Sequence, residues 1–201
     1  MITPSIEKIV AVMNDKGFRV YETDTVDWNL NIIGIRNSSQ SNKTFDDTLI
    51  VFHKFLNNWH IAYYPITTDP SDFYLLNPIN ANGTAILKEG QYKGAYKIDL
   101  HNDKYYALCQ RLEPVTVYRD NNRDGKLNFI ESSLKTGMFG INIHKGPKNG
   151  NWNSKNLNYS AGCQVFADSR YFNEFLEKCR NGAKSFGNKF TYTLLNENDF
   201  K

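Results

Sequence analysis

The chain has only three cysteines, at positions 109, 163 and 179. An odd number at such wide spacing supports neither a disulfide framework nor a zinc site, so each thiol needs its own explanation. Long apolar runs are also missing: near the N-terminus only residues 9–13 form one, and polar residues follow at once. This run is too short for a signal-peptide core or a membrane span, and we therefore expect synthesis in the cytoplasm without membrane insertion.

Charge of one sign is not concentrated anywhere. Lys and Arg number 24, Asp and Glu number 21, and the net charge is +3 at pH 7. Without a run of like charges there is no nucleic-acid-binding arm, although mild attraction to an anionic polymer such as cell wall is allowed. Internal repeats and low-complexity tracts are absent from the sequence as well. We expect one domain over residues 1–201, with no nucleic-acid partner.

Apolar periodicity predicts a mainly β protein with one helix near each end. The first helix covers residues 4–16, and the second carries an apolar stripe at positions 172, 175, 176 and 179 and ends around Asn181 and Gly182. Between and after them, short β-prone segments are separated by Asn, Gly, Pro and Asp; they cover residues 18–22, 31–36, 48–55, 59–67, 84–88, 93–100, 105–111, 114–119, 138–144 and 189–195. Such a series indicates a β-rich sandwich or barrel.

Two segments carry the residues best suited to chemistry. Residues 140–144 (GINIH) form a strand-like run that ends in His144, and residues 159–165 (YSAGCQV) form a turn around Cys163. A cysteine becomes a strong nucleophile when an imidazole or local dipoles stabilise its thiolate. Its small neighbours Ala161 and Gly162 let a substrate carbonyl approach and leave backbone N–H groups free for an oxyanion. The alternative is a small buried thiol and a hydrogen-bonded core histidine.

A histidine followed, after a loop, by Ser-x-Gly-Cys resembles the signature of the L,D-transpeptidase catalytic domain family. The resemblance implies that Cys163 is the acylated nucleophile and that His144 activates it and later protonates the leaving amine. Ser160 and Gly162 would shape the turn. The predicted substrate-binding residues are Trp152, in the loop before the nucleophile, and Gln164, next to it.

The motif itself spans residues 140–166, and the resemblance extends over the β-rich region from about residue 45 to residue 195. Residues 1–40, with the N-terminal helix and a strand, have no counterpart and no assigned role. The family usually has a histidine where Ala161 stands and an arginine or asparagine where Val165 stands. These departures leave the nucleophile and base in place and suggest a divergent, phage-related branch.

A second motif is independent of the first. Residues 120–131 (DNNRDGKLNFIE) fit the twelve-position calcium loop of the EF-hand, with Gly125 at the sharp turn and an apolar residue at position 8. The predicted ligands are Asp120, Asn122, Asp124, the Lys126 carbonyl, Asn128 through a water, and Glu131. A strand rather than a helix precedes the loop, so the alternative is a surface turn rich in Asp, Asn and Gly. No organic cofactor is expected.

The sequence thus supports two functions of different classes. The first is an enzyme acting on peptidoglycan stem peptides through a cysteine thioester, which either cleaves them, as a phage endolysin or delivered effector would, or cross-links them. The second is a non-catalytic virion or injection-apparatus protein that keeps the fold and binds the cell wall. A papain-type protease is disfavoured because its cysteine precedes its histidine. Either protein would reach the bacterial envelope by phage- or secretion-mediated delivery.

The remaining histidines and cysteines are assigned smaller roles. His53 and His60 lie among aromatics in strand-like segments and are predicted to be structural, whereas His101 is a candidate for the same cleft as Cys163. Cys109 alternates like a buried strand residue, and Cys179 belongs to the apolar stripe of the second helix.

Overall fold

A computed structural model describes residues 1–39, 44–146 and 159–201. Within them, eight strands close into a barrel in the order β1-β11-β5-β6-β9-β10-β3-β2. Their bounds are β1 Asn31–Arg36, β2 Asp47–Phe55, β3 Asn58–Thr67, β5 Gly90–His101, β6 Tyr105–Gln110, β9 Ile143–Lys145, β10 Gln164–Phe166 and β11 Phe190–Asn196. The pairs β1–β11 and β9–β10 are parallel, and the other neighbours in the barrel are antiparallel.

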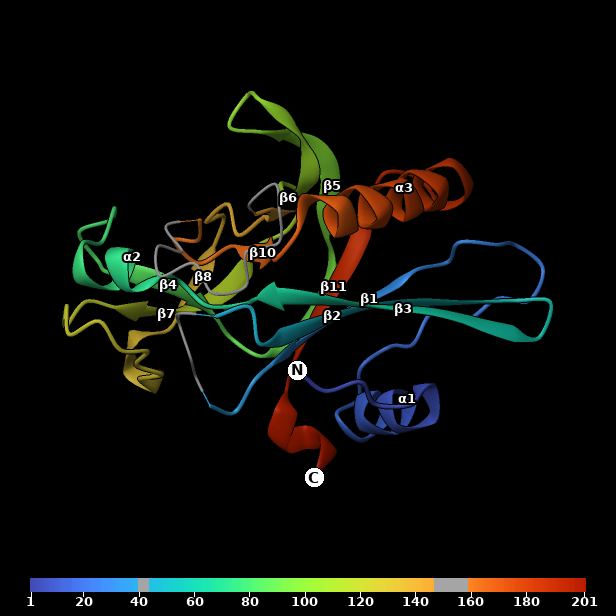
Figure 1. Cartoon of the computed structure of the whole chain (residues 1–201), viewed down its shortest axis with the longest axis horizontal. Coiled ribbons are helices and arrows are strands. Elements are labelled where there is room, and N and C mark those ends of the chain that lie inside the picture. The colour runs from blue at the N-terminus through green and yellow to red at the C-terminus, as the bar shows by residue number, and fades with distance from the viewer. Residues whose placement is uncertain (40–43, 147–158) are drawn as a thin grey trace.

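A second, three-stranded sheet lies at one end of the barrel, on the left in Figure 1. It consists of β4 Thr84–Leu87, β7 Val115–Asp120 and β8 Lys135–Gly137, in that order. The short helix α2 Asp72–Leu76 lies beside it, and the 3-10 helix η1 Glu131–Ser133 precedes β8. The prediction of a mainly β fold with an N-terminal and a C-terminal helix is therefore confirmed.

Alternating side chains give the barrel two apolar faces. Ile32 on β1 and Leu49 and Val51 on β2 join the inner cluster, whereas Ile33 and Ile50 belong to an outer cluster. Helix α1 Ile6–Asp15 covers that outer cluster with its apolar stripe, and the Ser5 side chain caps its first turn. The chain ends with the 3-10 helix η2 Glu197–Phe200, close to α1 (Figure 1).

Helix α3 Ser169–Phe186 is longer than the sequence predicts. Asp168 caps the start of the helix by accepting a hydrogen bond from the Arg170 N–H. The helix continues through Gly182 and is capped at its end by Gly187, whose φ is 84°. A Cβ on Gly182 would lie 3.1 Å from the Trp28 carbonyl oxygen. This glycine is therefore needed for close packing in mid-helix, and the predicted end at residues 181–182 is wrong.

Two of the predicted strands are also corrected. The segment 138–144 is not one strand, because β8 ends at Gly137 and β9 starts only at Ile143. Between these two strands, three consecutive backbone N–H groups donate hydrogen bonds to the Gln110 side-chain oxygen. Residues 18–22 form no strand, because the N–H groups of Arg19 and Tyr21 donate to side chains instead. In the part of the chain described, no helix has the length and apolar character needed to cross a membrane.

Candidate active site

Cys163 stands at the end of a tight turn that leads into β10. The Ser160 hydroxyl donates to the Cys163 carbonyl at 2.7 Å and accepts from the Gly162 N–H at 3.1 Å. The Ser160 carbonyl in turn accepts from the Ser71 N–H at 2.9 Å, which ties the turn to the start of α2. Ser160 therefore shapes the turn and has no free hydroxyl hydrogen for catalysis.

Gly162 permits the turn to approach the second sheet. Its φ is 122°, a backbone conformation that residues with a side chain rarely adopt. A Cβ atom at this position would lie 2.3 Å from the Ala85 carbonyl oxygen on β4. The sequence suggested that this glycine keeps the thiol accessible. The structure adds a second reason, because any side chain would separate the turn from β4.

The register of β9 and β10 directs Cys163 and His144 to the same face. Ile143 pairs with Gln164 and His144 with Val165 in a parallel ladder. Side chains alternate along a strand, and Ile143 belongs to the inner cluster while Val165 packs outside the barrel. Cys163 and His144 are therefore placed on the same, outer face of these two strands.

Cys163 is a half-buried residue whose thiol is held in place by backbone groups. The Asn142 N–H donates to Sγ at 3.4 Å, and the thiol donates to the Gly140 carbonyl at 3.5 Å. Burial of the sulfur raises the pKa of Cys163 to about 11, although the Asn142 N–H and, more weakly, Arg111 act in the opposite direction. At neutral pH the resting residue is thus a thiol that needs a base.

His144 is the candidate base, although its lowered pKa makes it a weaker proton acceptor than an exposed histidine. Its Nδ1 lies 2.9 Å from the Lys145 carbonyl oxygen, which can only accept, so Nδ1 carries the hydrogen and Nε2 carries the lone pair. The ring stacks on His101 with centroids 4.4 Å apart. Burial, with a further contribution from His101, lowers the pKa of His144 to about 4, so the imidazole is neutral at pH 7.

Asn142 joins these groups and was missed at the sequence level. Its side-chain oxygen accepts from the Gln110 N–H at 2.9 Å, which leaves Nδ2 as the donor to His101 Nδ1 at 3.0 Å. Its backbone N–H points at the sulfur. His101, predicted to share the cleft, lies at the end of β5 and stacks on His144. The hydrogen bond from Asn142 fixes the orientation of the His101 ring. The alternation of the GINIH run, with Asn142 on the same face as His144, is the signal that would have identified it.

Acid should destabilise the fold through His144. Its pKa is about 4 in the folded protein and near 6.5 when unfolded, so the stability that the neutral ring contributes is present above pH 6.5 and lost as the pH falls through 4. A shift of this size corresponds to about 3 kcal/mol of unfolding free energy across that window. Urea unfolding at a series of pH values between 7 and 4 measures this loss of unfolding free energy. His144→Gln should flatten the curve, while the exposed His60→Gln should not; equal curves for both variants would contradict the assignment.

A cavity of about 290 Å³ opens beside the thiol, between the second sheet and the turn. It is lined by residues 79, 80, 83, 85, 119, 138–141, 161 and 163, and Arg119 is the one charged residue among the described lining. The Arg119 guanidinium lies 4.6 Å from the centre of the Phe139 ring and donates to the Gly83 carbonyl. No carboxylate in the described residues pairs with it. Ala161 lines the same cavity, so its small side chain leaves room there.

Of the two predicted substrate-binding residues, only Gln164 lies in the part of the chain that the structure describes. Gln164 is fully buried inside the barrel, where its Oε1 accepts from the Tyr192 hydroxyl at 2.9 Å and its amide faces the Thr68 and Gly162 carbonyls. In this conformation Gln164 supports the turn from behind and does not line the cavity. Trp152 lies outside the described residues.

The calcium-loop residues form hydrogen bonds among themselves. Three of the predicted oxygen ligands, Asp120 Oδ2, Asp124 Oδ1 and the Lys126 carbonyl, converge on the Asn128 amide nitrogen at 3.0–3.4 Å. Asn122 accepts from the Asp124 N–H. Glu131 does not join them: it is 69% exposed and accepts from Lys88 Nζ at 2.9 Å and from Tyr118.

Calcium binding therefore stays a prediction that requires Glu131 to leave Lys88 and the Asn128 amide to turn away. Within the described residues, no group of three or more His, Cys, Asp or Glu side chains is arranged to hold a metal. If calcium binds the folded state, it should raise the melting temperature, and Glu131→Ala should remove that rise. Lys88→Gln is the matched control, because freeing Glu131 should strengthen binding. A rise that Glu131→Ala leaves unchanged would exclude Glu131 as a ligand.

The other two thiols and the other histidine pair lie away from the cavity. Cys109 on β6 and Cys179 on α3 are fully buried in the inner cluster, as predicted. His53 binds Asp27 at 2.8 Å and stacks on His60, with ring centroids 5.0 Å apart, which fits the predicted structural role.

Comparisons with protein-family models, with curated proteins and with solved structures find no match to this chain.

Proposed function

We propose that this protein is a cysteine enzyme that transfers or hydrolyses acyl groups of peptidoglycan stem peptides, as the resemblance to L,D-transpeptidases implies. One observation carries the proposal. A half-buried cysteine and a histidine whose Nε2 carries the ring's lone pair share one face of two parallel strands, and the cysteine borders a cavity. A purely structural thiol has no need of a neighbouring base.

The chemistry follows from the two neutral groups. As Sγ attacks the peptide carbonyl carbon, His144 Nε2 takes the thiol proton, so the weakly acidic thiol never has to ionise alone. The Asn142 N–H, already directed at Sγ, stabilises the charge that develops there. The imidazolium then protonates the leaving amine and a thioester remains. Water attack on it completes hydrolysis, and attack by an amine completes a cross-link.

The cavity suggests which substrates fit. Stem peptides carry free carboxylates close to their peptide bonds, and Arg119 is a cation without a carboxylate partner in the described residues, placed in the same cavity as Cys163. A guanidinium that is already held by a carbonyl and a ring loses little freedom when it binds a carboxylate. Arg119 is therefore proposed to position the carboxylate of the substrate.

Arg119 can be tested without any peptidoglycan. Alkylation of Cys163 by anionic iodoacetate, relative to neutral iodoacetamide, should fall about tenfold in Arg119→Gln, the equivalent of roughly 1.4 kcal/mol. Arg119→Lys should recover part of the ratio. Because iodoacetamide reports on any general damage to the site, the ratio isolates the charge effect. An unchanged ratio in Arg119→Gln would remove Arg119 from substrate recognition.

The reaction itself is tested with purified muropeptides analysed by mass spectrometry. Loss of a terminal residue or cleavage of a cross-link would indicate hydrolysis, and a mass gain from an added amine would indicate transfer. The same proposal assigns the protein to the bacterial envelope, reached by phage- or secretion-mediated delivery.

One observation favours a second candidate. In this conformation the hydrogen-bond partners of Sγ among the described residues are backbone groups, and His144 does not contact it directly. A wall-binding or structural protein that has kept the fold would show the same arrangement. It would bind sacculi equally well as wild type and as Cys163→Ala, and wild type would leave every muropeptide unchanged.

A further inference from the structure

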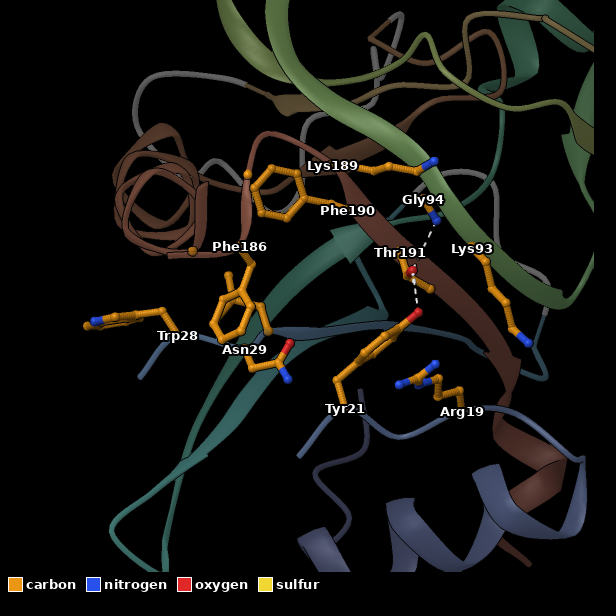
Figure 2. Close-up of a pocket in the computed structure, with 13 residues that line it drawn as sticks. Arg19, Tyr21, Trp28, Asn29, Lys93, Gly94, Phe186, Lys189, Phe190 and Thr191 are labelled. Carbon is orange, nitrogen blue, oxygen red and sulfur yellow. Dashed lines mark hydrogen bonds between the residues drawn. The ribbon is translucent and has the colours of Figure 1, made fainter. Parts of the chain in front are cut away.

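A second and larger cavity, of about 510 Å³, lies on another part of the barrel. Figure 2 shows it between the segment that follows α1, the end of α3 and strands β5 and β11. Four separate stretches of the chain build it: residues 19–21, 28–30, 93–94 and 182–191. None of them contributes to the Cys163 cavity. The volume is in the range of sites for small molecules.

One end of this cavity is cationic. Arg19 and Lys93 both line it there (Figure 2), and neither has an ion-pair partner among the described residues. The Arg19 guanidinium is held over the Tyr21 ring at 5.2 Å. A third cation on the rim, Lys189, pairs with Glu113 at 3.6 Å. No Asp or Glu is among the lining residues, so two positive charges at this end are uncompensated.

The other end is aromatic. Trp28 and Phe186 lie across the cavity from the two cations, with Phe190 above them (Figure 2). Phe186 is 45% exposed at the last turn of α3, so part of its ring is open to solvent. Trp28 has a φ of 71°, a conformation that is strained for a bulky residue and that tends to occur at functional sites.

The middle of the cavity is polar and preorganised. The Thr191 Oγ1 accepts from the Gly94 N–H at 3.0 Å and lies 2.9 Å from the Tyr21 hydroxyl. These two hydrogen bonds, drawn in Figure 2, join strands β5 and β11 to the segment that carries Arg19. They tie together the two segments that carry Arg19 and Lys93, so an anion would meet a cationic end that is already formed.

We propose that this cavity binds a small organic anion in which a planar ring is joined to a phosphate or carboxylate group. The anionic group would lie against Arg19 and Lys93, and the ring would lie against Trp28 and Phe186. A ligand with both parts satisfies the uncompensated charge and covers the exposed aromatic surface together. The proposal does not depend on catalysis by Cys163.

Isothermal titration calorimetry of the whole protein tests the proposal with two ring-bearing anions and their halves. Adenosine monophosphate and indole-3-acetate carry a ring with a phosphate and with a carboxylate, and so distinguish the two sources of charge. The separate halves are adenosine and inorganic phosphate for the first, and indole and acetate for the second. At least one ring-bearing anion should bind about tenfold or more tightly than either half, because only it reaches both ends. Its affinity should fall as salt is raised.

Variants then assign the contacts. The double variant Arg19→Gln/Lys93→Gln should weaken binding of that anion about tenfold or more, and Phe186→Ala about fivefold. Lys104→Gln, an exposed lysine outside this cavity, should change affinity less than twofold. All four side chains are exposed, so these variants should fold. Failure of both ring-bearing anions to bind at millimolar concentration would overturn the proposal, as would a double variant that binds like wild type.

Discussion

Replacing Cys163 or His144 with alanine should reduce turnover of muropeptides by roughly a thousandfold or more, and the double variant should be little worse than either. The reason is that, in the proposed mechanism, the sulfur and the imidazole act as one unit. Without Nε2, the thiol, whose pKa is about 11, must lose its proton to water before it attacks. Without the sulfur, the base has nothing to activate.

Two controls separate loss of chemistry from loss of structure. His60→Ala removes an exposed histidine outside the cavity and should keep full activity. Binding of each variant to sacculi should remain, because neither Cys163 nor His144 provides the charge that Arg119 does. Multiplicative losses in the double variant would show that the two residues do not cooperate, and full activity of either single variant would refute the assigned roles.

The elements that could be predicted are those with local signals. The β-prone segment at residues 31–36 matches β1 with the same bounds, and the helix predicted over residues 4–16 matches α1 to within two residues. The candidate residues His144 and Cys163 were also chosen from local signals, namely the small residues around the thiol and the strand-like run before the histidine. In each case the signal is carried by residues within a few positions of one another in sequence.

The contacts that could not be predicted join distant segments. His101 reaches His144 only because β5 pairs with β6 and β6 touches β9 at one residue pair, Leu108 with Ile143. Likewise, the Gln110 side-chain oxygen accepts hydrogen bonds from the backbone N–H groups of residues 139–141. These bonds prevent the strand that local propensity favours there. Glu131 fits a calcium loop by spacing, but Lys88, 43 positions away, binds it.

Packing explains why residue 165 is apolar. Val165 is fully buried in an outer cluster with Phe45 and Ala167. A polar side chain there would lose hydration without gaining a partner, at a cost of about 1–3 kcal/mol. The contact with Phe45 therefore favours an apolar residue at this position, next to the turn that carries Cys163.

Iodoacetamide should modify Cys163 about a hundredfold faster than Cys109 or Cys179, because alkylation requires both access and a thiolate. Cys163 borders a cavity, whereas the other two sulfurs are fully buried, and burial raises the pKa of Cys179 well beyond its usual range. Peptide mapping by mass spectrometry gives the three rates separately. Similar modification rates for all three cysteines would mean that the site is closed, and would contradict the assignment of Cys163 as the nucleophile.

The pH dependence of the same reaction tests the base. His144→Ala should slow modification of Cys163 near pH 7, where the thiol needs help to lose its proton. The difference should shrink toward pH 10, because hydroxide then supplies an increasing fraction of thiolate at a group whose pKa is about 11. Replacing His101 with asparagine leaves Nε2 of His144 in place and should retain most of the rate at pH 7. If His144→Ala instead follows wild type over the whole range, His144 is a structural neighbour of the thiol and not its base.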